Sequence, residues 1–440
     1  MIAHAPRPEH DAGDAWEAAP SLLEADVDAA RLWSESGCQA VTHPEAAVPA
    51  RLVGTVAGVV DGLDGHGAGL DERFGARGLG ALAERAATLL LRRSGRSSCG
   101  GASRLIAAGD EWLAVTLARA SDRDLLPAWL GVDPGAACVL GNADPWSEVA
   151  RRVAQRPSAE LVDSASALGL ACAAVDEMQA GSAVLRLPLG EARPRGLPGM
   201  RVVNLASLWA GPLAAHVLTR LGADVVCVES VGRPDGARAT PHWFDAMHAG
   251  QRSVALDFRS HEGVATLVAL LAAADVVIEG SRPRALEQLG ISAIELTQRG
   301  PRVWVSITGY GRDPATAMRV ALGDDAAAAG GVVGWAGGGP VFIADAVADP
   351  LTGLVTATAV VDAVTSGGRW LLDVALARVA SALAPRDADP ALPARSNASP
   401  GRPVPPGAPP FELGAHTAEV LDDWLGQPLA QPGADAHLNT

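Results

Sequence analysis

The sequence contains no lysine, so all 35 of its basic side chains are arginines. Aspartate and glutamate together number 50, and the formal net charge is −15 at pH 7. Proteins that bind nucleic acids or anionic membranes use positively charged surfaces. The charge balance therefore argues against both roles, and any bound phosphate group must be held by a local group of arginines.

Aromatic residues are scarce as well, at 4% of the chain, although hydrophobic residues make up 48%. Alanine, glycine and valine must therefore fill most of the interior, and these small side chains allow helices to pack closely on a sheet. A length of 440 residues gives room for two or three domains.

Long apolar runs and paired cysteines are also missing. The longest apolar run, residues 264–274, is too short to cross a bilayer and is followed by Asp275. The first twenty residues lack the basic and apolar regions of a signal peptide. None of the 5 cysteines forms a CxxC pair, which argues against a disulfide framework or a zinc site. These features predict a soluble, cytoplasmic protein without a metal.

The first half of the chain predicts helices followed by a small α+β unit. From Leu32 to Leu91, apolar residues recur three and four positions apart. Two short apolar runs around Gly109-Asp110 then predict a β-hairpin, and three helices and a strand (ACAAV, residues 171–175) follow it.

From residue 201 onward, apolar strands alternate with helices. The predicted helices are 211–221 and 262–274, and the predicted strands are 201–206, 224–229, 253–257, 275–279 and 302–308. This alternation is typical of a parallel sheet with right-handed crossovers. The fold class predicted for the whole chain is α/β, with a Rossmann-like parallel-sheet domain and a smaller α+β domain.

Composition changes along the chain predict the domain boundaries. Stretches rich in proline and glycine separate the two large units and precede the C-terminus. The predicted division is a polar lead-in (1–30), a helical and small α+β domain (31–190), a linker (191–200), a Rossmann-like domain with the candidate site (201–385), a proline-rich linker (386–411), and a C-terminal docking helix with its tail (412–440).

The segment Val341–Val364 combines an apolar run, two aspartates and a helix of small residues. Asp349 is predicted to be the N-cap, since its carboxylate could accept the unpaired N–H groups of the first turn, and Pro350 suits the first helical position. Gly353 is predicted to leave open space one turn further on. An ordinary helix cap explains this pattern, and so does a reactive carboxylate at a positive helix end.

Several familiar chemistries find no support in the motifs. Glu229 ends the second strand, where a dinucleotide enzyme has its ribose-binding acid, but the first turn (residues 207–213, SLWAGPL) lacks GxGxxG. No GxSxG elbow or P-loop is present. His242 and His248 flank Asp245, but nothing accompanies them as further metal ligands, so we interpret them as surface or ligand-contacting residues.

Five segments resemble the class III CoA-transferases (CaiB/BaiF-like), a family that includes the α-methylacyl-CoA racemases. They include a strand–AGP–helix–LGAD unit, an ADVVIEGSRP stretch and an LGAHTAEVL terminus. Their residues are 204–230, 252–291, 305–337, 348–364 and 413–421. Residues 110–131 resemble the family's small domain, which in usual members follows the Rossmann-like part and here precedes it.

The resemblance implies a CoA-transferase that moves CoA between an acyl-CoA and a carboxylic acid. Asp349 falls on the family's nucleophilic aspartate, and Gly353 completes its Asp-x-x-x-Gly motif, whereas Asp345 has no glycine four places after it. In the family this aspartate forms a mixed anhydride and then an aspartyl-CoA thioester. Coenzyme A is thus implied as a substrate, with no bound cofactor.

The resemblance also assigns residues to coenzyme A and the acyl group. Contacts at the first strand–helix turn, phosphate-binding arginines and two acids that position the acyl group are implied. These residues are Ser207, Leu208, Trp209, Ala210, Arg233, Arg238, Arg282, Arg319, Asp324 and Asp325.

The sequence leaves two alternative functions open. A racemase would need the histidine of a GHD motif, which here reads Gly323-Asp324-Asp325, and this difference favours the transferase. The unusual domain order also allows a non-catalytic CoA-binding partner subunit. The family forms interlocked dimers, so a homodimer is expected, and neither the acyl donor nor the acceptor acid can be read from the sequence.

Overall fold

The computed structural model describes residues 16–132, 144–384, 391–392, 400–405 and 407–426. Half of the predicted polar lead-in, part of the proline-rich linker and the tail after residue 426 lie outside the described residues. No helix of the described part is long and apolar enough to cross a membrane.

A sheet of eight described strands forms the centre of the molecule, in the order β1-β6-β14-β11-β10-β7-β8-β9. The six strands from β14 to β9 are mutually parallel. Their bounds are β7 Arg201–Asn204, β8 Asp224–Ser230, β9 Arg252–Leu256, β10 Val276–Glu279, β11 Val303–Thr308 and β14 Arg369–Ala375. The predicted parallel sheet is therefore confirmed, with bounds within about two residues.

The edge of the sheet beyond β11 is not predicted by the sequence analysis. There, β14 pairs with β6 (Val184–Gly190), and β6 pairs with β1 (Glu17–Ala18), both in antiparallel fashion. Strand β6 ends at Gly190, so the predicted linker begins where this strand ends. The two antiparallel strands close one edge of the sheet with residues that precede the Rossmann-like part.

Alternating apolar residues give the sheet two buried faces. Neighbours such as Val202 and Val203, or Val303 and Trp304, belong to different hydrophobic clusters, because successive side chains of a strand point to opposite faces. One face is covered by α9 (Ala210–Arg220) and α15 (Ala348–Ser366), and the other by α11 (His261–Ala273), α13 (Ala293–Arg299) and α17 (Thr417–Leu425). The remaining helices of this half are α10 Pro241–Met247, α12 Pro283–Glu287 and α16 Leu376–Leu383.

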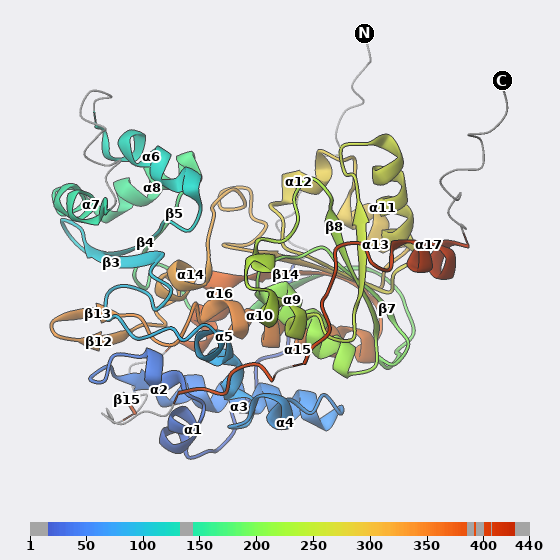
Figure 1. Cartoon of the computed structure of the whole chain (residues 1–440), viewed down its shortest axis with the longest axis horizontal. Helices are drawn as coiled ribbons and strands as arrows, with labels where there is room; N and C mark the ends of the chain where they lie inside the picture. Colours follow the sequence, from blue (N-terminus) through green and yellow to red (C-terminus); the bar gives the residue numbers. More distant parts are fainter. Residues whose placement is uncertain (1–15, 133–143, 385–390, 393–399, 406, 427–440) are drawn as a thin grey trace, which may run out of the picture.

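The C-terminal docking helix is confirmed. Val420, Leu421 and Trp424 of α17 are buried against the face of the sheet that α11 also covers. Figure 1 shows α17 close to α11 and α13.

The first helices of the chain pack into the same core as α15. Buried side chains of α1 (Ala29–Glu35), α2 (Cys38–Val41), α3 (Ala50–Gly65) and α4 (Leu70–Phe74) join the cluster that contains α9 and α15. They are followed by the 3-10 helix η1 (Leu79–Leu82) and α5 (Glu84–Thr88). Strand β2 (Val48–Pro49) pairs with β15 (Ala391–Leu392). The predicted 31–190 domain is thus divided, because its helical part shares the core of the Rossmann-like part.

The small α+β unit has a core of its own. Its antiparallel sheet consists of β3 (Ser103–Ala107), β4 (Trp112–Thr116) and β5 (Ala171–Ala174), and α6 (Ala120–Leu130), α7 (Trp146–Val153) and α8 (Ser158–Leu168) cover it. The predicted hairpin and the helices after it are confirmed.

Helix α14 joins this small unit to the rest of the molecule. The helix spans Gly323–Ala329 and contacts both β4 and β5 on one side and α15 and α16 on the other. A hairpin of β12 (Gly334–Ala336) and β13 (Gly339–Val341) follows it. Figure 1 shows the small unit at the left, with α14 between it and the main sheet. The small α+β unit, which precedes the Rossmann-like part in the chain, therefore lies beside the segment that carries Asp349.

Candidate active site

Asp349 is the second residue of α15, the helix predicted to carry the site. The helix begins at Ala348, Val347 occupies the cap position, and no side chain caps the helix end. The prediction that Asp349 is the N-cap is therefore wrong. The backbone turns into the helix earlier, because the N–H of Asp349 already donates to the carbonyl of Ala346 at 2.9 Å. The carboxylate nevertheless stays in the first turn, where the helix dipole favours negative charge.

Gly353 does not leave open space for a ligand. A Cβ at this position would lie 2.8 Å from the Ala210 carbonyl oxygen and 2.8 Å from Leu213 Cβ, both on α9. The predicted gap is therefore filled by the neighbouring helix, and the absence of a side chain lets α9 and α15 approach closely. Gly353 supports the position of α15 without facing the site.

Three aspartates and one arginine gather around the start of α15. We call Asp324, Asp345, Asp349 and Arg85 the acidic cluster. Asp345 is buried and accepts hydrogen bonds from Arg85 Nε at 2.9 Å and Arg85 Nη2 at 2.5 Å. Asp324 accepts from the backbone N–H of Ala346 at 3.1 Å. Among the described residues, no side chain donates a hydrogen bond to Asp349 or forms an ion pair with it.

Two carboxyl groups of the acidic cluster, those of Asp349 and Asp324, have raised pKa values. Burial raises the pKa of Asp349 to about 7, and the nearby charges of Asp324 and Asp345 act in the same direction, while Arg85 opposes them. Burial, followed by the charge of Asp345, raises the pKa of Asp324 to about 6. A carboxyl group that titrates near neutrality in this way is a candidate for a reacting group.

Gly323, the first residue of α14, lies against Asp349. A Cβ on Gly323 would be 2.6 Å from Asp349 Oδ2 and 2.3 Å from the Ala346 carbonyl oxygen. The backbone N–H of Gly323 lowers the pKa of Asp349, although less than burial raises it. A glycine is thus needed here because α14 brings its backbone, rather than a side chain, next to the carboxylate.

Two hydroxyl groups of the small unit hold the aspartates of α14. Ser103 Oγ on β3 donates to Asp324 Oδ2 at 2.9 Å, and Thr116 Oγ1 on β4 donates to Asp325 Oδ1 at 2.8 Å. The two hydroxyls are themselves 2.9 Å apart. This row of hydrogen bonds fixes the hairpin of the small unit to the helix that contacts Asp349.

Asp325 is a structural residue in this arrangement. It is fully buried, and its carboxyl oxygens also accept from the backbone N–H of Leu322 at 3.1 and 3.3 Å, which caps α14. Burial raises its pKa to about 8. The prediction that Asp325 positions an acyl group is not supported, because its oxygens face Thr116 and the start of its own helix. Asp324 remains in the acidic cluster.

The first strand–helix turn lies at the carboxyl ends of the parallel strands, as expected for a binding edge. Ser207 and Leu208 are exposed there, and Leu208 has a φ of 70°. The backbone N–H of Leu208 donates to both oxygens of Asp235, at 3.1 and 3.0 Å. The two exposed residues are placed where a ligand could contact them.

Trp209 and Ala210, the next two residues, are buried. The Trp209 ring packs edge-on against Trp243, with 5.4 Å between ring centroids, and the Arg85 guanidinium lies 5.1 Å from the Trp209 centroid. The indole therefore contacts other parts of the protein. It also links the first turn of the Rossmann-like part to the acidic cluster.

Arg233 and Arg282 follow β8 and β10 at the same edge of the sheet. Both are exposed, and neither forms an ion pair within the described residues. Partial burial lowers the pKa of Arg282, and the charges of Arg284, Arg119 and Arg233 lower it further. Guanidinium groups gathered in this way repel one another, and a bound anion would relieve that repulsion.

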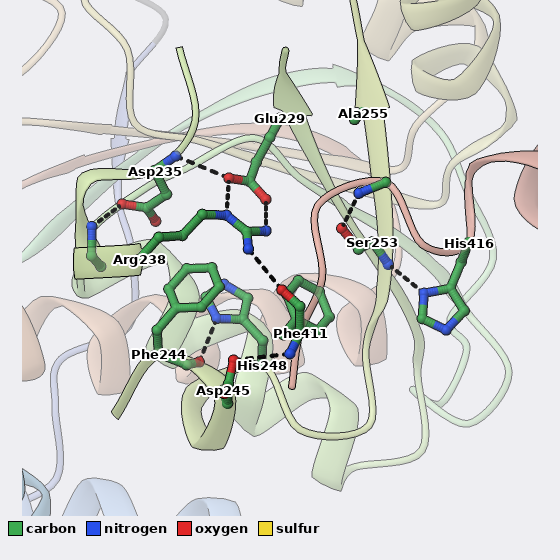
Figure 2. A network of polar contacts seen from close by, with 12 residues as sticks. Glu229, Asp235, Arg238, Phe244, Asp245, His248, Ser253, Ala255, Phe411 and His416 are labelled. Carbon is green, nitrogen blue, oxygen red and sulfur yellow. Dashed lines mark hydrogen bonds and ion pairs between the residues drawn. The ribbon is translucent and has the colours of Figure 1, made fainter. Parts of the chain in front are cut away.

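Arg238, in contrast, is occupied by the protein itself. Its Nε and Nη2 donate to Glu229 at 2.9 and 2.5 Å, and its Nη1 donates to the Phe411 carbonyl at 2.7 Å. Figure 2 shows this guanidinium between Glu229, Phe244 and Phe411. The prediction that Arg238 binds a phosphate is not supported, because all three guanidinium nitrogens already donate. We call Glu229, Asp235, Arg238 and Phe411 the Glu229 network.

Arg319 is likewise engaged. It forms an ion pair with Glu177 at 2.5 Å and lies 3.6 Å from the centroid of the Tyr310 ring. Its Nη2 also approaches the Cys172 carbonyl oxygen at 3.4 Å. Arg319 Nη2 therefore connects the small unit to the loop before α14, and the phosphate contact of Arg319 stays a prediction.

Sequence reasoning missed the residues that the N-terminal part contributes to the site. Arg85 belongs to the acidic cluster, and Cys99 and Ser103 contact its aspartates. The Cys99 Sγ lies 3.1 Å from Asp345 Oδ1. Burial raises the pKa of the Cys99 thiol, so this group is a neutral neighbour. Arg85 lies in a helical segment among other arginines, and no local pattern distinguishes it. Only the fold brings it to Asp345, 260 residues away in the sequence.

Part of the chain is similar to known proteins. Residues 197–411 match the sequence model of CoA-transferase family III. This segment, which contains α14 and α15, makes up just under half of the chain and is similar to that family. Arg85, Cys99 and Ser103 lie outside the matched residues.

Individual relatives match about two fifths of the chain. An acyl-CoA transferase of Fusarium pseudograminearum is 30% identical over 196 residues, covering 39% of this chain and 42% of that protein. A succinate–glutarate CoA-transferase of Agrobacterium fabrum is 31% identical over 209 residues, covering 42% and 52%. The crystal structure of a CAIB/BAIF family protein from Brucella suis matches 43% of this chain and 55% of that one at 32% identity, with a TM-score of 0.39. The chain thus spans about half the length of these relatives.

Proposed function

We propose that this protein is a CoA-transferase that exchanges coenzyme A between an acyl-CoA and a carboxylic acid through Asp349. One observation carries the proposal. The Asp349 carboxyl group stands in the first turn of a 19-residue helix, half-buried and without a side-chain partner among the described residues, within the segment that matches the family. A carboxylate kept free in this way is available as a nucleophile.

The proposed reaction consists of four acyl transfers. The Asp349 carboxylate attacks the thioester carbonyl of the donor, forming an acyl–aspartyl anhydride and expelling the CoA thiolate. The thiolate attacks the aspartyl carbonyl of the anhydride, which gives an aspartyl-CoA thioester and releases the donor acid. The acceptor carboxylate then attacks this thioester to form a second anhydride, again expelling the thiolate. Attack of the thiolate on the acceptor's acyl carbon yields the new acyl-CoA and restores Asp349. Every bond broken is replaced, and no water is consumed.

The surroundings of Asp349 suit these steps. The N-terminus of α15 and the Gly323 N–H favour negative charge, which helps to keep the carboxylate ionised and stabilises the tetrahedral oxyanions. Burial raises the pKa of Asp349 to about 7. The group is therefore partly ionised at neutral pH and more reactive than a carboxylate with an ordinary pKa.

The nucleotide of coenzyme A is proposed to lie along the carboxyl ends of the parallel strands. Arg233 and Arg282 would bind its phosphates there, supported by their exposure and their lack of ion pairs within the described residues. Ser207 and Leu208 would contact the same ligand at the first turn. Since the chain carries a net charge of −15, these local cations must act against the overall field.

The names of relatives suggest which substrates to test first. One relative is a succinate–glutarate CoA-transferase, and another, from Streptomyces coelicolor, is a formyl-CoA:oxalate CoA-transferase. We therefore propose small dicarboxylic acids as acceptors, with succinyl-CoA and glutarate as the first pair. A cytoplasmic location and a homodimer remain predictions, and analytical ultracentrifugation tests the dimer.

Trapping with hydroxylamine tests the proposed function. The protein is incubated with succinyl-CoA and hydroxylamine, digested, and mapped by mass spectrometry. A hydroxamate at Asp349 is expected. Its absence across a panel of acyl-CoA donors would contradict the proposal and favour a non-catalytic CoA-binding subunit. Incorporation of solvent deuterium at the α-carbon of a 2-methylacyl-CoA would instead indicate the racemase.

A further inference from the structure

We infer that Arg85, supplied by the N-terminal helical segment, binds the carboxylate of the acceptor acid beside Asp349. The inference rests on the proposed function, which needs a carboxylate to enter a site that already contains three aspartates. It assigns a role to a residue outside the segment that matches the family.

The hydrogen bonds of Arg85 leave part of its guanidinium free. Nε and Nη2 donate to the two carboxylate oxygens of Asp345. Within the described residues, Nη1 has no acceptor. Because a guanidinium carries two N–H groups on Nη1, Arg85 can donate to a second carboxylate without releasing the first.

The position of this guanidinium is fixed from two sides. Asp345 holds one edge, with only 2% of its side chain exposed, and the Trp209 ring lies 5.1 Å from the Arg85 Cζ. The Arg85 side chain itself is 27% exposed. A cation that is rigidly held and still reachable from solvent suits anion recognition, because little side-chain entropy is lost on binding.

The charges of the cluster make such a cation necessary. Asp324, Asp345 and Asp349 already stand near one another, and Arg85 is the positively charged side chain that acts most strongly on Asp349. An acceptor acid would bring a fourth carboxylate into this site. Without a cation, like charges would oppose its approach to Asp349.

A purely structural ion pair with Asp345 is the competing explanation. The variant R85M/D345N separates the two, because it removes both charges of the pair and leaves the net charge beside Asp349 unchanged. D345N alone serves as the matched control, since it retains Arg85. Thermal unfolding followed by circular dichroism establishes that both variants are folded.

The variants are compared in both halves of the reaction. Hydroxamate formation at Asp349 from succinyl-CoA, without an acceptor acid, reports the first half of the reaction in R85M/D345N, and the KM for glutarate reports the second. The KM for glutarate should rise at least about tenfold, since a charge-assisted hydrogen bond is lost. D345N, which retains Arg85 and removes one like charge, should have a KM for glutarate equal to or below that of the parent. An unchanged KM for glutarate in R85M/D345N would show that Arg85 is only structural.

A second measurement does not depend on catalysis. Phenylglyoxal modifies accessible arginines, and peptide mapping reports the modification of Arg85 in the unaltered protein. Saturating glutarate should slow the modification of Arg85 at least about tenfold, while Arg259, which is exposed, reacts at the same rate with and without the acid. Equal labelling of Arg85 with and without glutarate would overturn the inference. Protection of Arg85 without any Asp349 hydroxamate would instead retain the carboxylate site and reject the transferase.

Discussion

Glu229 and Asp349 both carry carboxyl groups within the matched segment, but their surroundings differ. Glu229 accepts two hydrogen bonds from Arg238 and one from the Asp235 N–H at 2.9 Å (Figure 2). Burial tends to raise the pKa of Glu229, but these donors outweigh it and the pKa is lowered. Asp349 has no comparable side-chain donor among the described residues, and its pKa rises to about 7.

The difference separates a carboxylate that is held by the fold from one that, in the proposed function, is left available to react. The Glu229 network joins β8, the loop after it and the segment at Phe411, and its hydrogen bonds satisfy the charged groups it buries. The acidic cluster instead gathers three carboxylates around one cation, and the like charges help to raise the pKa values of Asp324 and Asp349. Functional sites commonly show such unfavourable arrangements.

The largest effect is expected from D349N, which removes the unpaired carboxylate. The rate of CoA transfer should fall at least about a thousandfold, because the nucleophile is lost while the fold is retained. Steady-state kinetics with succinyl-CoA and glutarate measures it. D362N, on the same helix, should remain within about twofold of the parent, and comparable losses in both variants would contradict the assignment.

R238A tests the stabilising side of the comparison. Removing the Arg238 side chain leaves the buried Glu229 charge without its partner, so the free energy of unfolding should fall by about 3 kcal/mol. Urea denaturation measures this change. R233A, in which an exposed arginine is removed, should change the stability by less than about 0.5 kcal/mol. A similar small loss for R238A would mean that the network contributes little.

R233A/R282A tests whether unpaired arginines differ from the paired Arg238 in binding. The dissociation constant of coenzyme A should rise about tenfold, and its dependence on salt should weaken, because charge-assisted contacts to phosphate are removed. Isothermal titration calorimetry gives both quantities. R259A removes an exposed arginine that is paired with Asp257 and should bind coenzyme A like the parent. Unchanged affinity in R233A/R282A would place the nucleotide elsewhere.

The smallest effect is expected from D325N, as a dependence of stability on pH. The pKa of Asp325 is about 8 in the folded protein, against an ordinary value of 3.8. The folded state therefore binds more protons than the unfolded state between these values, and this group's contribution to stability falls as pH rises through them. Asparagine removes this dependence, so D325N should gain about 1 kcal/mol relative to the parent between pH 7 and 8. Urea denaturation measures the free energy of unfolding of both proteins at each pH. If the two values changed with pH by the same amount, the raised pKa of Asp325 would be contradicted.

The sequence was sufficient to predict five of the six parallel strands, the hairpin and the docking helix, because their hydrophobic periodicities are local. It also placed Asp349 at the start of α15. Contacts between distant segments could not be predicted in the same way. The Ser103 hydroxyl meets Asp324 across 221 positions, and no spacing rule relates them.

The arginines illustrate the same limit. Arg238 and Arg282 both follow strands at the binding edge and could not be distinguished in the sequence. Their roles differ because Glu229 lies beside one of them, whereas the other is surrounded by further arginines. Gly353 was misinterpreted for a related reason, since the space beside a glycine depends on which helix packs there.

The most direct test of the account is the amount of CoA covalently linked to Asp349 as a function of pH. The protein is mixed with succinyl-CoA, quenched rapidly in acid and mapped by mass spectrometry at pH values from about 5 to 9. The adduct should be confined to Asp349, and its rate of formation should rise with pH with a midpoint near 7, where the carboxyl group loses its proton. An adduct on another carboxylate, or a rate that does not change over this range, would contradict the central claim.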